Sequence, residues 1–201
     1  MKRVCLFFLL LCLLILFSCS TIQSPKPWKL EDQDPNITGF LFVKIKPTVN
    51  YPCANKLKCR TRWILTGAAN SNPKKAINYG DIETSNLIEG KYLLYPLKSD
   101  ATYLLGYAAN IYGSIKPAWS APYRCYFDIK PGEIAYMGSF NPVEDFKLVK
   151  GGTQKQVSYN FTRMDTFDTF EIDNNWLKSR FPTLNKIYRI KNYFPEKVNI
   201  D

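Results

Sequence analysis

The sequence predicts a mainly β domain, an antiparallel two-sheet sandwich followed by a C-terminal helix. From residue 37 onward, short apolar or alternating runs are separated by turn residues, a pattern typical of antiparallel β structure. Near residue 168 the spacing of apolar side chains changes from two residues to that of an α-helix. The length of the chain is close to that of a single domain with one core.

Five runs in the first part of this domain predict strands. They cover residues 39–45, 58–65, 91–97, 102–108 and 121–129. Pro96 lies near the end of the third run and predicts an edge strand or the end of a strand, because proline has no N–H to donate to a neighbour. In the fifth run Tyr123, Cys125 and Phe127 share one face, since side chains alternate along a strand.

Two hairpins are predicted after these runs. Pro131 and Gly132 occupy the central positions of a type II turn, where proline presets φ and glycine accepts a positive φ. Residues 133–140 form the return strand. Residues 146–150 and 154–161 form the second hairpin around Gly151-Gly152.

A helix is predicted over residues 168–181. Its apolar stripe consists of Phe167, Phe170, Leu177 and Phe181. Asp168 and Glu171 match a capping pattern at its start, and Pro182 ends it. Ile172 and Trp176 lie on a second face, which favours packing between the sheet and another segment over contact with a partner. For residues 183–201 helix and strand both remain open.

The N-terminus has the pattern of a secretory signal. Lys2 and Arg3 precede an apolar run over residues 4–17, whose helical length of about 21 Å is short of the roughly 30 Å of a bilayer core. The stretch Leu16-Phe17-Ser18-Cys19 resembles the lipobox of bacterial lipoproteins, although Phe17 departs from the usual small or branched residue. This resemblance implies cleavage before Cys19 and acylation of that cysteine with chains such as palmitate. A plain signal peptide cut elsewhere is the alternative.

The segment after the signal predicts a tether. It contains three prolines in a polar stretch without an apolar period, so we expect residues 20–36 to be poorly ordered and to reach at most about 56 Å. The predicted organisation is therefore a signal peptide (1–18), a tether (19–36), a β-sandwich (37–163), and a helix with a basic, aromatic tail packed on the sandwich (164–201). Ser20 resembles the outer-membrane sorting pattern of enteric lipoproteins, which implies an envelope location facing the periplasm.

Three short motifs carry a second resemblance. They are Gly90-Lys91-Tyr92-Leu93, the stretch 130–138 around the predicted type II turn, and residues 176–182 at the helix end. Their layout resembles small, uncharacterised bacterial envelope lipoproteins in which a sandwich, similar to immunoglobulin-like or transthyretin-like domains, precedes a helix. That resemblance implies no activity.

The chain is basic, with a formal net charge of +10. In an exported protein this charge points to anionic lipids or polymers such as lipopolysaccharide and peptidoglycan, and we predict no nucleic-acid partner. Four cations recur at every second position, at Lys56, Lys58, Arg60 and Arg62. Alternation places them on one face of a strand, as contacts for an anionic ligand or as protection against edge-to-edge pairing.

Three cysteines remain after the signal and the lipobox. We predict a disulfide between Cys53 and Cys59, worth about 2 kcal/mol from loop closure, and a free, buried Cys125. The rival pairing joins Cys59 to Cys125 across the two sheets, as in immunoglobulin domains. With no histidine in the chain these cysteines make a poor zinc site, so no metal or cofactor is predicted.

The absence of histidine also excludes Ser-His-Asp and Cys-His nucleophilic sites. Carboxylate chemistry remains, and three pairs are the nearest candidates, Asp81 with Glu83, Glu144 with Asp145 and Asp165 with Asp168. Solvated loop or cap positions explain these pairs better. The aromatic stretch 103–119, with Tyr107, Tyr112 and Trp119, is a candidate loop platform for a sugar or peptide.

Together these observations predict a lipid-anchored bacterial envelope protein whose folded part is a non-enzymatic binding or assembly module. Its partners would be the membrane, through the lipid on Cys19, and envelope proteins or anionic polymers. The alternative is a binder of lipopolysaccharide or peptidoglycan through the basic strand face and the aromatic loop. A carboxylate-dependent hydrolase is the second alternative.

Overall fold

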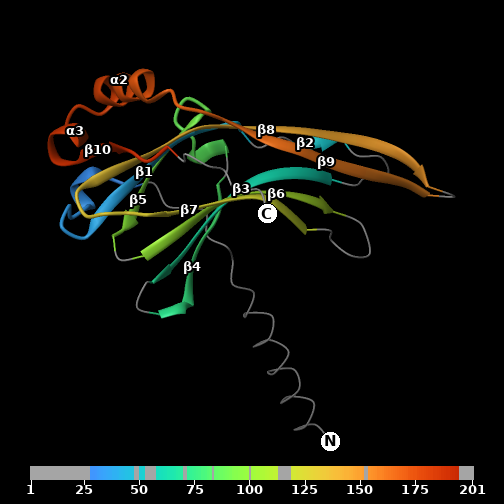
Figure 1. Cartoon of the computed structure of the whole chain (residues 1–201), viewed down its shortest axis with the longest axis horizontal. Coiled ribbons are helices and arrows are strands. Elements are labelled where there is room, and N and C mark those ends of the chain that lie inside the picture. The colour runs from blue at the N-terminus through green and yellow to red at the C-terminus, as the bar shows by residue number, and fades with distance from the viewer. Residues whose placement is uncertain are drawn as a thin grey trace, which may run out of the picture.

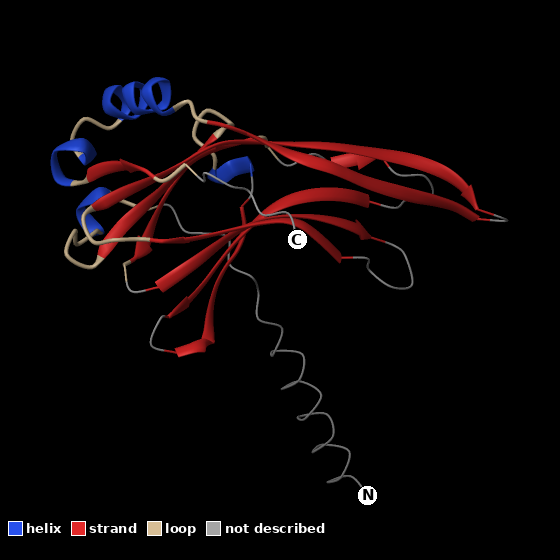
Figure 2. Ribbon diagram, viewed as in Figure 1, coloured by secondary structure: helices blue, strands red, loops and turns tan. Residues whose placement is uncertain are grey.

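The computed structural model describes residues 28–47, 50–52, 58–69, 72–82, 84–99, 101–112, 119–151 and 154–194. Two β-sheets face each other, and short helices lie against the outer side of one of them (Figures 1 and 2). The predicted fold class is confirmed, because the chain is mainly β, forms two sheets and continues into a C-terminal helix.

The first sheet, sheet A, combines the two ends of the described chain. Its strands are β1 (Thr38–Ile45), β5 (Tyr92–Lys98), β8 (Glu133–Gly151), β9 (Gln154–Phe167) and β10 (Arg189–Asn192). The order is β10-β8-β1-β5, and β9 also pairs with β8. β8 runs parallel to both β1 and β10, whereas the other pairs are antiparallel. Sequence analysis had predicted antiparallel pairing throughout; long connections through the other sheet and the helices allow the parallel pairs.

The second sheet, sheet B, lies between β1 and β8 in the chain. It contains β2 (Asn50–Pro52), β3 (Lys58–Ala69), β4 (Asn72–Ile82), β6 (Ala101–Tyr112) and β7 (Trp119–Asp128). The order is β2-β3-β6-β7, with β4 paired to the other part of β3. Sequence analysis missed β2 and β4. β4 is rich in Asn and Lys and carries Pro73 and Gly80, so its composition does not favour a strand.

The turn and edge predictions are confirmed. Gly132 has φ of +68°, and the Glu133 N–H donates to the Lys130 carbonyl oxygen at 3.3 Å. β5, which contains Pro96, is an edge strand of sheet A, which agrees with the first of the two alternatives for that proline. The two strands predicted at 133–140 and 146–150 form one long strand, β8, in which Pro142 lies opposite Met164.

Aromatic side chains fill the space between the sheets. Trp63 is fully buried and contacts Tyr107, Tyr123 and Phe140, with ring centroids 4.9 to 6.4 Å apart. Its indole N–H donates to the Lys46 carbonyl oxygen at 2.9 Å. The polar end of this large ring is therefore satisfied inside the core.

A second core lies between sheet A and the helices. The helices are α2 (Phe170–Arg180) and α3 (Leu184–Ile187), and they contribute Leu177 and Leu184 to it. Sheet A supplies Phe40, Phe42, Tyr92, Leu94, Ile134 and Tyr136. Because sheet A is covered on both faces, residues 40–43 form a continuous buried run in β1. The part of the tail that sequence analysis left open forms α3 and then β10.

The second half of the predicted tether, from residue 28 to residue 36, belongs to the folded domain. Trp28 packs edge-on against Phe40 at 5.0 Å, and its indole N–H donates to the Leu94 carbonyl oxygen at 2.9 Å. The 3₁₀ helix η1 (Leu30–Asp32) follows. Two apolar side chains, Trp28 and Leu30, hold an otherwise polar segment against sheet A. From Cys19 to Trp28 an extended chain covers at most about 30 Å.

Candidate functional site

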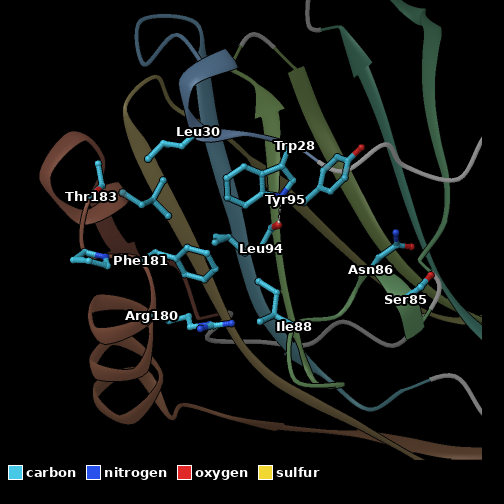
Figure 3. Close-up of a pocket in the computed structure, with 12 residues that line it drawn as sticks. Trp28, Leu30, Ser85, Asn86, Ile88, Leu94, Tyr95, Arg180, Phe181 and Thr183 are labelled. Carbon is cyan, nitrogen blue, oxygen red and sulfur yellow. Dashed lines mark hydrogen bonds between the residues drawn. The ribbon is translucent and has the colours of Figure 1, made fainter.

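A pocket of about 550 Å³ lies where the end of α2 and the beginning of α3 face the edge of sheet A (Figure 3). This volume is in the range of small-molecule sites. Four separate segments of the chain line the pocket. The lining residues are Trp28, Leu30, Ser85, Asn86, Ile88, Leu94, Tyr95, Arg180, Phe181, Pro182, Thr183 and Leu184.

The walls of the pocket are mainly apolar. The rings of Trp28 and Phe181 lie with their centroids 6.4 Å apart. Leu94 of β5 also lines the pocket. Pro182 follows the last turn of α2, where the Phe181 N–H donates to the Leu177 carbonyl oxygen at 2.8 Å. The predicted helix end at Pro182 thus places Phe181 and Leu184 beside the pocket.

A few polar groups interrupt these walls. Ser85 and Asn86 come from the 3₁₀ helix η3 (Thr84–Asn86), and Thr183 precedes α3. Arg180 is the charged residue among the described lining residues, and it is exposed. Figure 3 shows its side chain extending between Phe181 and Ile88. A predominantly apolar cavity with few polar groups is the usual composition of a ligand site.

The position of α2 above sheet A depends on a buried carboxylate. Asp173 has no exposed surface and accepts three hydrogen bonds from hydroxyl groups. The donors are Tyr92 at 2.8 Å, Tyr136 at 2.7 Å and Thr169 at 2.6 Å. Burying a charge is costly unless it is hydrogen-bonded, so these hydroxyls make the buried position of Asp173 tolerable.

Both tyrosines respond to this environment. Desolvation raises the pKa of Tyr92 above its usual value, and its hydrogen bond to the Asp173 carboxylate raises it further. Desolvation is also the largest cause of the raised pKa of Tyr136, with a further increase from Asp173. The hydroxyls therefore remain protonated donors, and the cluster anchors α2 to the sheet.

Trp176 extends the anchor toward the pocket. Its ring stacks on that of Tyr92 with centroids 3.9 Å apart, and its indole N–H donates to the Glu89 carboxylate at 3.1 Å. Glu89 is the neighbour of the lining residue Ile88. The loop and the helix on this side of the pocket are thus joined by a direct hydrogen bond.

The structure places only part of the predicted basic strand face. Lys58, Arg60 and Arg62 belong to β3, whereas Lys56 lies outside the described residues. Arg62 is buried, with 8% of its surface exposed, so this member is not open to a polymer. The side chains of Lys58 and Arg60 are also outside the description, and their role stays a prediction.

The structure tests only some of the cysteine predictions. Cys19, Cys53 and the side chain of Cys59 lie outside the described residues, so the anchor and the loop disulfide stay predictions. Cys125 is free and buried. The rival bridge from Cys59 to Cys125 is wrong, because both residues are in sheet B. On the intervening β6 they pair with Ile111 and Leu105, about 20 Å apart along the strand.

The described members of the carboxylate pairs serve separate contacts. Glu144 accepts a hydrogen bond from the Tyr107 hydroxyl at 2.7 Å, and Asp165 pairs with Arg163 at 2.7 Å. Asp168 accepts from the Phe170 N–H at 3.0 Å just before α2, but the predicted capping pattern is wrong, because Thr169 is the N-cap and its side chain caps no helix N–H. Within the described parts of the chain, no group of three or more acidic or cysteine side chains could hold a metal ion.

The predicted aromatic loop is largely a strand. β6 contains Tyr103 and Tyr107, which are buried between the sheets and therefore unavailable as a platform. Tyr107 instead packs with Trp63. Alternation in a strand sends these rings inward, whereas residues 113–118 lie outside the described part.

Sequence analysis missed the pocket and the carboxylate anchor. Trp28 offered a signal, because a large aromatic residue in a polar segment indicates burial. Asp173 offered another, since it lies on the same helical face as Phe170 and Leu177.

Comparison with known proteins found no matching family model, curated protein or solved structure. Among the described residues there is also no helix that is long and apolar enough to span a membrane.

Proposed function

We propose that this chain is a lipid-anchored bacterial envelope protein whose folded part is a non-enzymatic binding module, with the pocket between sheet A and the α2–α3 junction as its binding site. The observation that carries the proposal is the pocket itself, with its apolar walls and few polar groups. Its rim is built from the rigid edge of β5 and from a helix held by Asp173.

The proposed anchor rests on the lipobox-like stretch that ends at Cys19. Acyl chains on Cys19 would hold the protein at a membrane, which we expect to be the outer membrane on its periplasmic side. Because Trp28 lines the pocket, the pocket would lie within about 30 Å of the lipid along the chain. This arrangement favours a ligand that is delivered from, or transferred to, the membrane surface.

Polymer binding through the basic strand face is less well supported. Arg62 is buried, and Tyr103 and Tyr107 of the supposed aromatic platform are core residues. The pocket, in contrast, is formed by described residues from segments far apart in the sequence.

The proposed binding site is tested with N-phenyl-1-naphthylamine, a neutral apolar dye whose fluorescence rises in apolar surroundings. We expect saturable binding at one site per chain. Ser85→Trp places a large ring at the exposed rim of the pocket and should abolish binding, whereas Ser179→Trp, on an exposed turn of α2 outside the lining, should preserve it. Absence of saturable binding, or equal binding by both variants, contradicts the proposed site.

The anchor is tested separately by detergent-phase partitioning of the full-length protein. We expect the mature protein to enter the detergent phase with acyl mass on Cys19, and Cys19→Ala to remain in the aqueous phase. A wild-type product without lipid would contradict the anchor. It would not affect the test of the pocket, which uses dye binding.

A further inference from the structure

We infer that the ligand of this pocket is a single-chain anionic amphiphile, with its hydrocarbon chain against the apolar walls and its anionic head at Arg180. This inference rests on the proposed function, because it specifies the ligand of the proposed site. Three observations on the described residues support it: the composition of the walls, the charge at the rim, and the place where the N-terminal segment joins the domain.

The walls suit a hydrocarbon chain. Trp28, Leu30 and Leu94 form one side, and Phe181 with Leu184 forms the side of the helices. Leu94 and Leu184 are nearly fully buried, so these walls are continuous with the second core. Burying a CH₂ group is worth about 0.8 kcal/mol, or about fourfold in affinity, so a chain of several such groups gains most of its affinity here.

The rim suits an anionic head. Arg180 is the one charged residue in the described lining, and within the described part of the chain its guanidinium makes no ion pair. The carboxylate of Glu89, which follows the lining residue Ile88, accepts a hydrogen bond from the neutral Trp176 indole N–H. Arg180 therefore offers its donors to a ligand, and guanidinium binds carboxylate or phosphate groups in a two-point geometry.

On the two helices the charge near Arg180 has the same sign, whereas Glu31, Asp32 and Glu89 are acidic neighbours of the lining residues Leu30 and Ile88. Lys178 and Lys186 are exposed on α2 and α3, on either side of Arg180 in the chain. Glu171 and Asp173 lie in the opposite, N-terminal turn of α2, where Asp173 is buried. An anion is therefore favoured over a cation at the helix junction.

The position of Trp28 suggests where such a ligand comes from. Its place in the pocket wall keeps the pocket near the proposed lipid anchor, so membrane-derived fatty acids and lysophospholipids are both available sources of the same chemistry. The acyl chains of Cys19 itself are a different occupant, because they carry no anionic head. The experiment separates these cases.

The test measures displacement of N-phenyl-1-naphthylamine from the Cys19→Ala protein by three detergents below their micelle concentrations. The competitors are dodecanoate, dodecyltrimethylammonium and dodecyl maltoside, which share a chain length and differ in head-group charge. We expect dodecanoate to displace the dye at a concentration about tenfold lower than the other two, the effect of one charge-assisted contact. Equal displacement by all three overturns the inference while leaving the binding site itself intact.

Two matched variants locate the charge effect. Arg180→Gln should remove the preference for dodecanoate while preserving dye binding, and Lys178→Gln removes the same charge from an exposed position of α2 outside the pocket and should retain the preference. If Arg180→Gln keeps the preference for dodecanoate, or if both variants lose it equally, the role of Arg180 is overturned. If the wild-type protein does not bind the dye at all, the proposed function fails rather than this inference.

The source is tested with the lipidated protein. If it binds dodecanoate as the Cys19→Ala protein does, the pocket accepts an external amphiphile. If only Cys19→Ala binds, the protein's own acyl chain fills the pocket, and the inference is overturned. Displacement by lysophosphatidylglycerol compared with dodecanoate then distinguishes a lipid head group from a free carboxylate.

Discussion

Replacing Asp173 by alanine should be among the most destabilising single changes in the helical part of this protein. The substitution removes the common acceptor of Tyr92, Tyr136 and Thr169. Tyr92 and Tyr136 are nearly fully buried, so their hydroxyls cannot be satisfied by bulk water. A hydrogen bond to a charged group is worth about 1.5 to 3 kcal/mol, and leaving a buried polar group unpaired costs about 1 to 3 kcal/mol.

These contributions are not additive, because relief of the desolvation of Asp173 itself offsets part of the loss. We therefore expect the free energy of unfolding to fall by about 3 to 4 kcal/mol, a large part of the 5 to 15 kcal/mol typical of a domain. The assay is urea unfolding followed by tryptophan emission, with far-ultraviolet circular dichroism as a second probe. Trp176 stacks on Tyr92 and so reports directly on this cluster.

A matched control and a compensating variant make the result specific. Glu171→Ala removes an exposed carboxylate from the same first turn and should cost about 0.5 kcal/mol through the helix dipole. Asp173→Leu combined with Tyr92→Phe and Tyr136→Phe replaces the whole cluster by apolar groups and should recover at least half of the loss. If Asp173→Ala costs no more than Glu171→Ala, the carboxylate does not anchor α2.

Three further outcomes follow from the described contacts. Desolvation raises the pKa of Tyr136, so above pH 10 the unfolded chain releases a proton that the folded chain keeps, and stability falls as pH rises. Between pH 10.5 and 11.5, urea titrations should show the wild type losing about 1.2 kcal/mol more than Tyr136→Phe. Gly39→Ala would place a Cβ 2.5 Å from the Lys130 carbonyl oxygen and 2.9 Å from that of Glu133, and should lower the midpoint of thermal unfolding by at least 5 °C, whereas an unchanged midpoint would refute the close approach. Because burial raises the pKa of the Cys125 thiol, alkylation followed by mass spectrometry should label Cys125 only after denaturation, and rapid labelling of the native protein would contradict its burial.

The pocket and the carboxylate anchor together explain why the last part of the chain folds back on sheet A. β9 pairs with β8 as far as Phe167. The chain then continues through α2 and α3, which pack on the outer face of sheet A, and β10 pairs with β8 again. This path brings Arg180 and Phe181 to Trp28, from nearly the opposite end of the described chain. Variants that release α2 should therefore also weaken binding in the pocket.

The sequence by itself determined the elements whose signals are local. Short apolar or alternating runs predicted β1, β3, β5, β6 and β7. The type II turn at Pro131-Gly132 was predicted because proline presets φ and glycine accepts a positive φ. Pro96 predicted an edge strand or a strand end, because proline has no N–H to donate to a neighbouring strand. The end of α2 before Pro182 is also a local effect of neighbouring residues.

Only the tertiary structure decided what depends on distant partners. The parallel pairing of β1 with β8 joins segments separated by the whole of sheet B, and no local pattern specifies that partner. The hydrogen bonds of Asp173 could not be predicted, because its donors Tyr92 and Tyr136 lie far away in the sequence. The pocket is built in the same way: each of its walls is an ordinary apolar or loop residue in the sequence, and packing across sheet A brings them around one space. Burial and hydrogen bonding between distant side chains, which alternation and turn propensity do not encode, created the candidate site.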